Sequence, residues 1–199
     1  EPTPDGARER LGAPNDSDTL VLYIGAHGIS QGLASVVDAA WLCARDASIR
    51  FALVGEGADK EAVLSHAKEL GSANVTFLGG VARDEVQGLL AAADICLVPL
   101  RDIPLFDTFI PSKMFELMAA GKPIIASLRG EAATILEDAG ATVVAPEDPE
   151  ALAAAVRAVA DDDQLRIKMG KVARDFVVTN FDRRRLAARY IALFNEVTA

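Results

Sequence analysis

A lysine and a glutamate three residues apart, Lys113 and Glu116, are the strongest chemical signal in the sequence. Pro111 disfavours helix before it and Ser112 is a plausible N-cap, so both side chains fall in the first turn of a predicted helix. Glu116 stands among apolar residues, where a carboxylate needs partners. Two interpretations are open. Glu116 forms an ion pair with Lys113, helped by the helix N-terminus, or it accepts hydrogen bonds from two neighbouring hydroxyls, as on a ribose.

Three glycine-containing turns are the second signal. The segment Gly25–Gly32 reads G-A-H-G-I-S-Q-G and lies between a predicted strand and a predicted helix. Its amides could bind an anion, although a compact turn that binds nothing explains the same pattern, and the lone His27 is either a surface side chain or a ligand to that anion. The spacing is not G-x-G-x-x-G and no acid ends the second predicted strand, which disfavours NAD. The simplest interpretation of Gly55–Gly57 is a turn, and the same holds for Gly79–Val81. The paired glycines of Gly79–Val81 would also let a flat ligand lie against the backbone.

Six short apolar segments predict the strands that must position these residues: 19–24, 49–54, 74–79, 94–100, 122–127 and 141–145. They do not alternate with polar residues, which is typical of a parallel sheet covered on both faces. Helical segments separate them, so the sequence predicts an α/β fold with a doubly wound parallel sheet that binds ligands beyond the carboxyl ends of its strands.

The two ends of the chain differ from this pattern. Residues 1–18 are polar and rich in Pro, Gly and Asp, and we expect a linker or tail there, with one domain over residues 19–199. From Pro149 onward three helical segments follow without a strand, with Asp148 or Pro149 starting the first and Asp182 capping the last.

Composition excludes several classes of function. The chain has 199 residues, 51% hydrophobic and 25% charged, which suits one buried core, and a net charge of −9 argues against a broad nucleic-acid surface. Two cysteines and two histidines make a disulfide framework or a zinc site improbable, and we expect Cys43 and Cys96 in the core. No apolar run reaches the roughly 18 residues of a membrane span, and no signal peptide is visible.

Several motifs occur in a fixed order: Y-I-G, L-V-G-E-G, V-T-F-L-G, A-D-I-C-L-V-P, P-S-K-M-F-E-L-M-A-A-G-K-P-I-I-A and Gly130-Glu131. In this order and spacing they resemble the C-terminal, donor-nucleotide-binding domain of retaining GT-B glycosyltransferases of the group 1 family, from about Leu20 to the C-terminus. The P-S-K and G-x-x-G-x-x-Q-G versions are similar to the subgroup that acts on amino- or deoxysugars in surface polysaccharide synthesis.

The resemblance implies a cytoplasmic enzyme with the Rossmann-like half of a GT-B fold. It would move a sugar from a nucleotide-diphosphate donor to an acceptor with retention of configuration, without a metal ion or other cofactor. A missing N-terminal domain would bind the acceptor and supply any general base, and any membrane association would occur only through that domain. The isolated domain would therefore be inactive or nearly so. The last helix would cross to that domain and leave apolar residues such as Tyr190, Leu193 and Phe194 partly exposed here.

The resemblance also assigns roles to the residues singled out above. The Gly25–Gly32 loop would face the donor diphosphate, Glu116 matches the second glutamate of an E-x7-E motif and would hold the ribose hydroxyls, and backbone near Val81 would contact the base. Lys113 would supply positive charge as the sugar leaves, which makes Lys113 and Glu116 the catalytic candidates. The expected donor site is Gly25, His27, Gly28, Gln31, Gly55, Val81, Ser112, Lys113 and Glu116.

Three positions depart from the family pattern. Thr108 stands where the first glutamate of the motif would be, and Ala26 and Gln31 stand where an Arg and a Lys are common. His27, Lys113 and helix amides would then neutralise more of the diphosphate. Two other functions stay open: a sugar-nucleotide epimerase of the same two-domain architecture, which would need acid/base carboxylates and a cationic His or Arg set, and a non-catalytic α/β interaction module.

Overall fold

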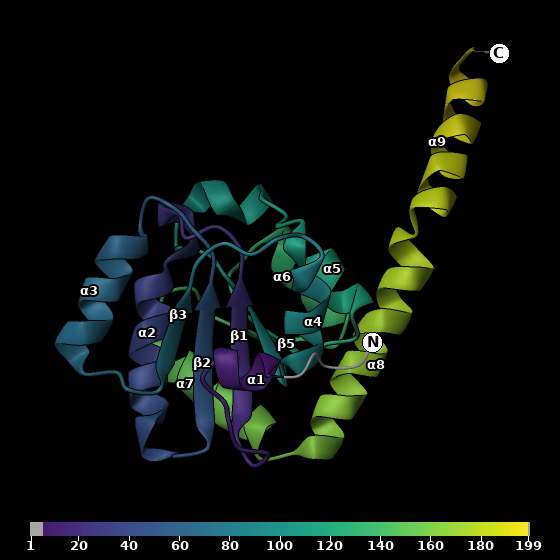
Figure 1. Cartoon of the computed structure of the whole chain (residues 1–199). Coiled ribbons are helices and arrows are strands. Elements are labelled where there is room, and N and C mark those ends of the chain that lie inside the picture. The colour runs from purple at the N-terminus through teal and green to yellow at the C-terminus, as the bar shows by residue number, and fades with distance from the viewer. Residues whose placement is uncertain (1–5, 199) are drawn as a thin grey trace.

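A computed structural model describes residues 6–198 of the chain. Its strands form one six-stranded sheet at the centre of the molecule (Figure 1). In chain order they are β1 (Thr19–Ile24), β2 (Ile49–Val54), β3 (Val75–Leu78), β4 (Ile95–Pro99), β5 (Ile124–Ser127) and β6 (Thr142–Val144). Each strand lies within the segment that the apolar pattern predicted.

All neighbouring strands are parallel, in the order β3-β2-β1-β4-β5-β6. The prediction of a doubly wound sheet of six strands is therefore confirmed. The order reverses between β1 and β4, so the connections that leave these two strands diverge to opposite faces of the sheet. Such a switch point leaves a crevice at the carboxyl ends of the strands, where ligands bind in this type of fold.

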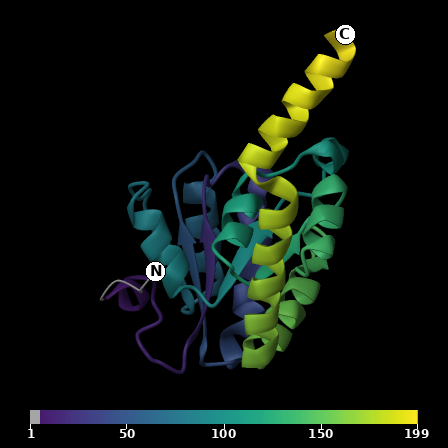
Figure 2. The ribbon, with the colours of Figure 1, turned by 90° about the vertical axis from the view of Figure 1, so that its right-hand side faces the viewer.

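Helices cover both faces of the sheet (Figures 1 and 2). The α-helices are α1 (Ala7–Arg10), α2 (Leu33–Leu42), α3 (Lys60–Leu70), α4 (Glu85–Ala92), α5 (Lys113–Ala119), α6 (Glu131–Asp138), α7 (Pro149–Ala160), α8 (Asp163–Phe181) and α9 (Arg183–Thr198). Short 3-10 helices are η1 (Ile29–Gln31), η2 (Cys43–Arg45) and η3 (Pro104–Thr108). Among the described residues, no helix has the length and apolar character needed to cross a bilayer.

Two hydrophobic cores lie on the two faces of the sheet. In β1, Leu20 and Leu22 pack into the core beneath α4, α5, α6 and α8, whereas Val21 and Tyr23 pack into the core beneath α2, α3 and α7. Alternate residues of one strand thus serve two buried faces, which is why the strand sequences are apolar throughout. Both cysteines are buried in these cores, as predicted, and burial raises the pKa of Cys43 to about 11 and that of Cys96 to about 12.

The polar N-terminal segment differs from the predicted linker. Residues 1–5 lie outside the described residues, but α1 packs against α4, and Leu11 and Ala13 are fully buried. Arg8 anchors the segment through bonds to the Ala92 carbonyl at 2.8 Å and the Asp94 carboxylate at 3.0 Å. Three buried apolar residues, Ala7, Leu11 and Ala13, attach this polar stretch to the domain, so residues 6–18 are not a free tail.

The helical tail ends in a projecting helix. α8 packs along α5, and α9 extends away from the domain (Figures 1 and 2). The predicted caps are confirmed, because Asp148 accepts a hydrogen bond from the amide of Ala151, and Asp182 accepts from the amides of Arg184 and Arg185. The predicted exposure of apolar residues on α9 is also confirmed, with Tyr190 65%, Leu193 57% and Phe194 63% exposed.

Candidate functional site

The crevice at the switch point is bridged by a tyrosine and a lysine from opposite sides. Tyr23 is the last but one residue of β1, and Lys113 is the first residue of α5, which follows β4. The Nζ of Lys113 lies 2.9 Å from the Tyr23 hydroxyl oxygen and 4.0 Å from the centroid of its ring. Two chain segments that diverge from the sheet are thus joined at the place where a ligand would enter.

Gly25 makes room for this lysine. Its φ is +149°, a conformation that side chains rarely adopt, and a Cβ at this position would stand 2.4 Å from the Lys113 Nζ. Lys113 forms no ion pair with any residue of the described chain, including Glu116, so the ion-pair interpretation of this pair does not hold. Burial lowers the pKa of Lys113 to about 8, while the charge of Glu116 acts in the opposite direction.

The loops after β1 and β2 are locked together by backbone contact. A Cβ on Gly55 would stand 1.8 Å from the carbonyl oxygen of Gly25, and a Cβ on Gly57 would stand 2.2 Å from the carbonyl oxygen of His27. The amide of His27 donates to the carbonyl of Glu56, and its carbonyl accepts from the amide of Asp59. Gly55 is buried, so its small size serves this packing and not an open surface in the described conformation.

His27 lies inside this junction. Its side chain is fully buried, so the simpler interpretation of a surface histidine was wrong. Neither ring nitrogen has a hydrogen-bond partner among the described residues, and burial, with the charge of Lys60, lowers its pKa. The ring is therefore neutral and does not face solvent in this conformation.

Fewer amides of the Gly25–Gly32 loop are available than the sequence suggests. Those of Gly25 and His27 donate to carbonyls, and that of Gly28 donates to the side-chain oxygen of Gln31 at 3.0 Å. Gln31 thus closes its own turn. The amides of Ala26, Ile29 and Ser30 are the ones left without a partner in the described chain.

Glu116 is turned outward from α5. Its side chain is exposed, and its carboxylate takes part in no hydrogen bond or ion pair within residues 6–198. It lines two hollows of about 500 and 480 Å³, which lie toward α4 and toward the end of α8. Ser112 lines the second hollow; it precedes α5, as predicted for a cap, but its hydroxyl makes no capping bond. A carboxylate without partners beside open space is free to accept from a ligand.

Val81 lies in the loop that follows the carboxyl end of β3, partly buried against the core. It follows the exposed pair Gly79-Gly80, and the amide of Gly80 donates to Glu56 at 3.3 Å. Glu56 also pairs with Lys60 at 2.8 Å. The rim of the sheet therefore carries Val81, the Glu56–Lys60 pair, the Gly25 loop and α5.

Other cations at this rim are already neutralised. Arg101 lies 3.2 Å from the Glu147 carboxylate, which also accepts from the amide of Asp102 at 2.8 Å, and Arg129 pairs with Asp102 at 2.8 Å. These pairs hold the loop between β4 and α5, and sequence reasoning missed them because their partners are far apart in the chain. Sequence reasoning also missed Tyr23, although a phenolic hydroxyl two residues before Gly25, near the carboxyl end of a mostly apolar strand, was a usable signal.

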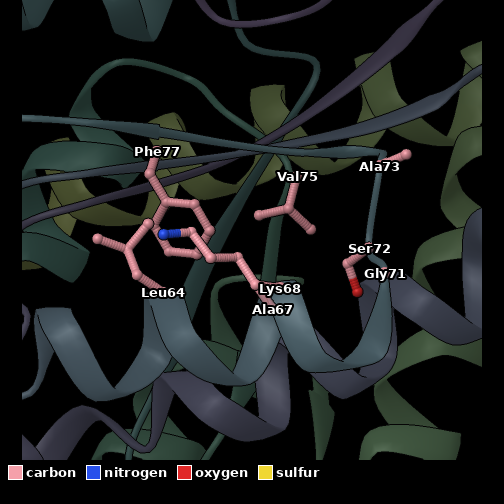
Figure 3. A pocket seen from close by; sticks show the side chains of 8 residues that line it. All are labelled: Leu64, Ala67, Lys68, Gly71, Ser72, Ala73, Val75 and Phe77. Atoms are coloured by element: carbon pink, nitrogen blue, oxygen red, sulfur yellow. The ribbon is translucent and has the colours of Figure 1, made fainter.

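Thr108, at the position of the first glutamate of the motif, ends η3. It is exposed and donates to the carbonyl of Leu105 at 3.4 Å. Within residues 6–198, no three His, Cys, Asp or Glu side chains are grouped so that they could hold a metal ion. A further hollow lies between α3 and the edge strand β3, lined by Leu64, Val75, Phe77 and Lys68 (Figure 3). It is on the side of the sheet and apart from the rim just described.

A comparison with protein families decides the class of this chain. The family described as glycosyl transferases, group 1, matches residues 18–162. The chain belongs to this family. The membership favours glycosyl transfer over sugar-nucleotide epimerisation, and it agrees with the resemblance seen in the motifs.

Individual relatives support the group 1 assignment. The putative colanic acid biosynthesis glycosyl transferase WcaI of Escherichia coli is 30% identical over 94% of this chain and 45% of its own length. The structure of sucrose-phosphate synthase from Thermosynechococcus elongatus matches with a TM-score of 0.80 and 26% identity, over 97% of this chain and 48% of that one. Anabaena HepE in complex with UDP has the same fold, with a TM-score of 0.81 and 20% identity over 98% and 54% of the two chains. The chain spans about half the length of these proteins.

Proposed function

We propose that this group 1 domain binds the nucleotide-sugar donor of a retaining glycosyltransferase. The observation that carries the proposal is the cation at the switch point. Lys113 stands against Gly25 with the neutral hydroxyl of Tyr23 as its hydrogen-bond partner, and an exposed carboxylate without a partner in the described chain, that of Glu116, lies one helical turn away. Such a pair suits a ligand that carries both a diphosphate and vicinal hydroxyls.

In the proposed complex the nucleotide lies along the rim from Val81 to the Gly25 loop. The base would rest on backbone near Val81, and Glu116 would accept hydrogen bonds from the ribose hydroxyls. Lys113 would stabilise the charge that develops on the diphosphate as the sugar leaves, so the proposed reaction uses a fixed charge of the protein and needs no metal ion. The structure of HepE with UDP supports a nucleoside diphosphate at this fold.

The acceptor would bind elsewhere. Because the chain spans 45% of the length of WcaI, we propose that an N-terminal domain supplies the acceptor site and any general base, and that α9 packs against that domain through its exposed apolar residues. The 199-residue chain alone would then bind nucleotide weakly and transfer little sugar. Because its relative WcaI is described as a glycosyl transferase of colanic acid biosynthesis, we propose that the whole protein acts in the synthesis of a surface polysaccharide.

Calorimetry against UDP, GDP, ADP and inorganic pyrophosphate tests the proposal. Replacing the carboxylate in Glu116→Gln should weaken binding of the preferred nucleotide at least about tenfold, since hydrogen bonds to a charged group contribute about 1.5–3 kcal/mol. It should leave pyrophosphate binding unchanged, because pyrophosphate has no ribose. Glu137→Gln, an exposed position on α6, is the matched control. Absence of binding by all three nucleotides, or equal effects of the two variants, would defeat the assignment.

A further inference from the structure

The bond between Tyr23 and Lys113 has a fixed direction. The Tyr23 hydroxyl lies 2.6 Å from the carbonyl oxygen of Ala26 and 2.9 Å from the Lys113 Nζ. A hydroxyl has one hydrogen, and a carbonyl can only accept, so the hydroxyl donates to Ala26 and accepts from the lysine. Tyr23 therefore favours the charged ammonium and holds it against the loop after β1.

The ammonium of Lys113 is incompletely partnered. It has three donors, of which the Tyr23 hydroxyl takes one, and no carboxylate pairs with it in the described chain. The neighbouring cations are each paired with a carboxylate: Lys60 with Glu56, Arg101 with Glu147 and Arg129 with Asp102. Positive charge at the crevice is thus kept at one point, where a small anion would be its natural counter-ion.

The surroundings of Lys113 come from three elements. Tyr23 faces it from β1, His27 lies within range of its charge in the loop after β1, and Glu116 is on its own helix. Burial alone would drive the lysine toward its neutral form, and its pKa is lowered to about 8. Among these groups, the Tyr23 hydroxyl is the one in hydrogen-bond contact with the ammonium.

We infer that Tyr23 is a positioning residue of the donor site, which holds Lys113 charged and directed at the diphosphate of the ligand. This inference rests on the proposed function, since it gives Lys113 its anion. Tyr23 itself touches no ligand in this arrangement. It acts through the lysine, in place of the arginine and lysine that the loop lacks at Ala26 and Gln31.

Pyrophosphate binding to the 199-residue chain at two pH values tests the inference. Tyr23→Phe keeps the ring and removes the acceptor, so Lys113 should lose its proton at lower pH. We expect the variant to bind at most about threefold more weakly at about pH 6.5, where the lysine is charged in both proteins, and about tenfold more weakly at about pH 8.5. The ratio between two proteins cancels the titration of the ligand itself. Tyr190→Phe on α9 is the matched control and should change neither value.

Three results would overturn the inference. A loss for Tyr23→Phe that is equal at both pH values indicates a general structural role, as does a loss shared by Tyr190→Phe. If Tyr23→Phe does not fold, proton uptake by the unchanged chain tests the step on which the inference depends, that Lys113 binds the anion in its charged form. At about pH 8, calorimetry in two buffers should show about half a proton more taken up per pyrophosphate than in Lys113→Met, and equal uptake contradicts the inference. The proposed function fails separately, when no nucleoside diphosphate binds to the unchanged chain.

Discussion

Gly55 offers a sharp test of how the loops after β1 and β2 are built. A Cβ at this position would stand 1.8 Å from the Gly25 carbonyl oxygen and 3.0 Å from the ring of His27, and φ is +149°. Backbone contact cannot be relieved by rotating a side chain, so Gly55→Ala must push the two loops apart. We therefore expect a large loss of stability in the absence of any ligand.

The magnitude follows from two costs. A side chain in a backbone region that is almost restricted to glycine costs about 1–3 kcal/mol, and overpacking costs about 1–3 kcal/mol more. Their sum, about 4 kcal/mol, corresponds to roughly 8–16 °C in Tm for a chain of this length. Gly71→Ala is the matched control, because its φ is +66° and a Cβ there meets nothing within 4 Å, so it should lose only about 1 kcal/mol.

Thermal unfolding and nucleotide binding of both variants separate packing from ligand contact. If Gly55→Ala unfolds no earlier than Gly71→Ala and yet binds nucleotide much more weakly, Gly55 contacts the ligand directly and the packing argument is refuted. An intermediate result is expected for Gly57→Ala, whose Cβ would stand 2.2 Å from the His27 carbonyl oxygen without the positive φ.

Three further changes probe other parts of the molecule. Because the pKa of Lys113 is about 8, below the ordinary lysine value of 10.5, the folded chain binds fewer protons than the unfolded chain between these pH values. The free energy of unfolding, relative to that of Lys113→Met, should therefore rise from about pH 8 to about pH 10. Urea midpoints of the two proteins that change in parallel over this range would contradict the prediction. Leu11→Ala should lower the free energy of unfolding by about 3 kcal/mol, since Leu11 is fully buried, and a loss under about 1 kcal/mol would mean that residues 6–18 are detached. Asp182→Ala removes the carboxylate that accepts hydrogen bonds from the amides of Arg184 and Arg185, and should destabilise α9 by about 1 kcal/mol. We expect a weaker helical circular dichroism signal with an unchanged urea midpoint. An unchanged helical signal would show that the cap is dispensable.

The fold was largely predictable because its signals are local. Apolar runs such as Thr19–Ile24 predicted every strand, and Asp148 and Asp182 predicted helix starts. The order of the strands could not be predicted from such local signals, because it depends on which segments pair in space. The burial of Leu11 and Ala13 was missed for a similar reason: a polar segment hides how few apolar residues are needed to dock it.

The site was predictable in its parts but not in its connections. Lys113 and the Gly25 loop were singled out separately, and only the structure shows the Lys113 Nζ 2.4 Å from where a Cβ of residue 25 would stand. His27 and Gln31 were expected to face the donor, yet one side chain is buried and the other bonds its own turn. Sequence cannot tell which polar groups are already satisfied, because their partners are chosen by tertiary contacts.

The position of Lys113 also bears on how such domains diverge. The loop after β1 and the first turn of α5 are about ninety residues apart, yet they share one small volume in which either a side chain from the loop or the lysine from the helix can be accommodated. During evolution a basic residue can therefore be lost from one of these segments and gained in the other without moving the proposed anion site. Homologues should show correlated substitution at positions 25 and 113, with a basic residue gained at one place as it is lost at the other.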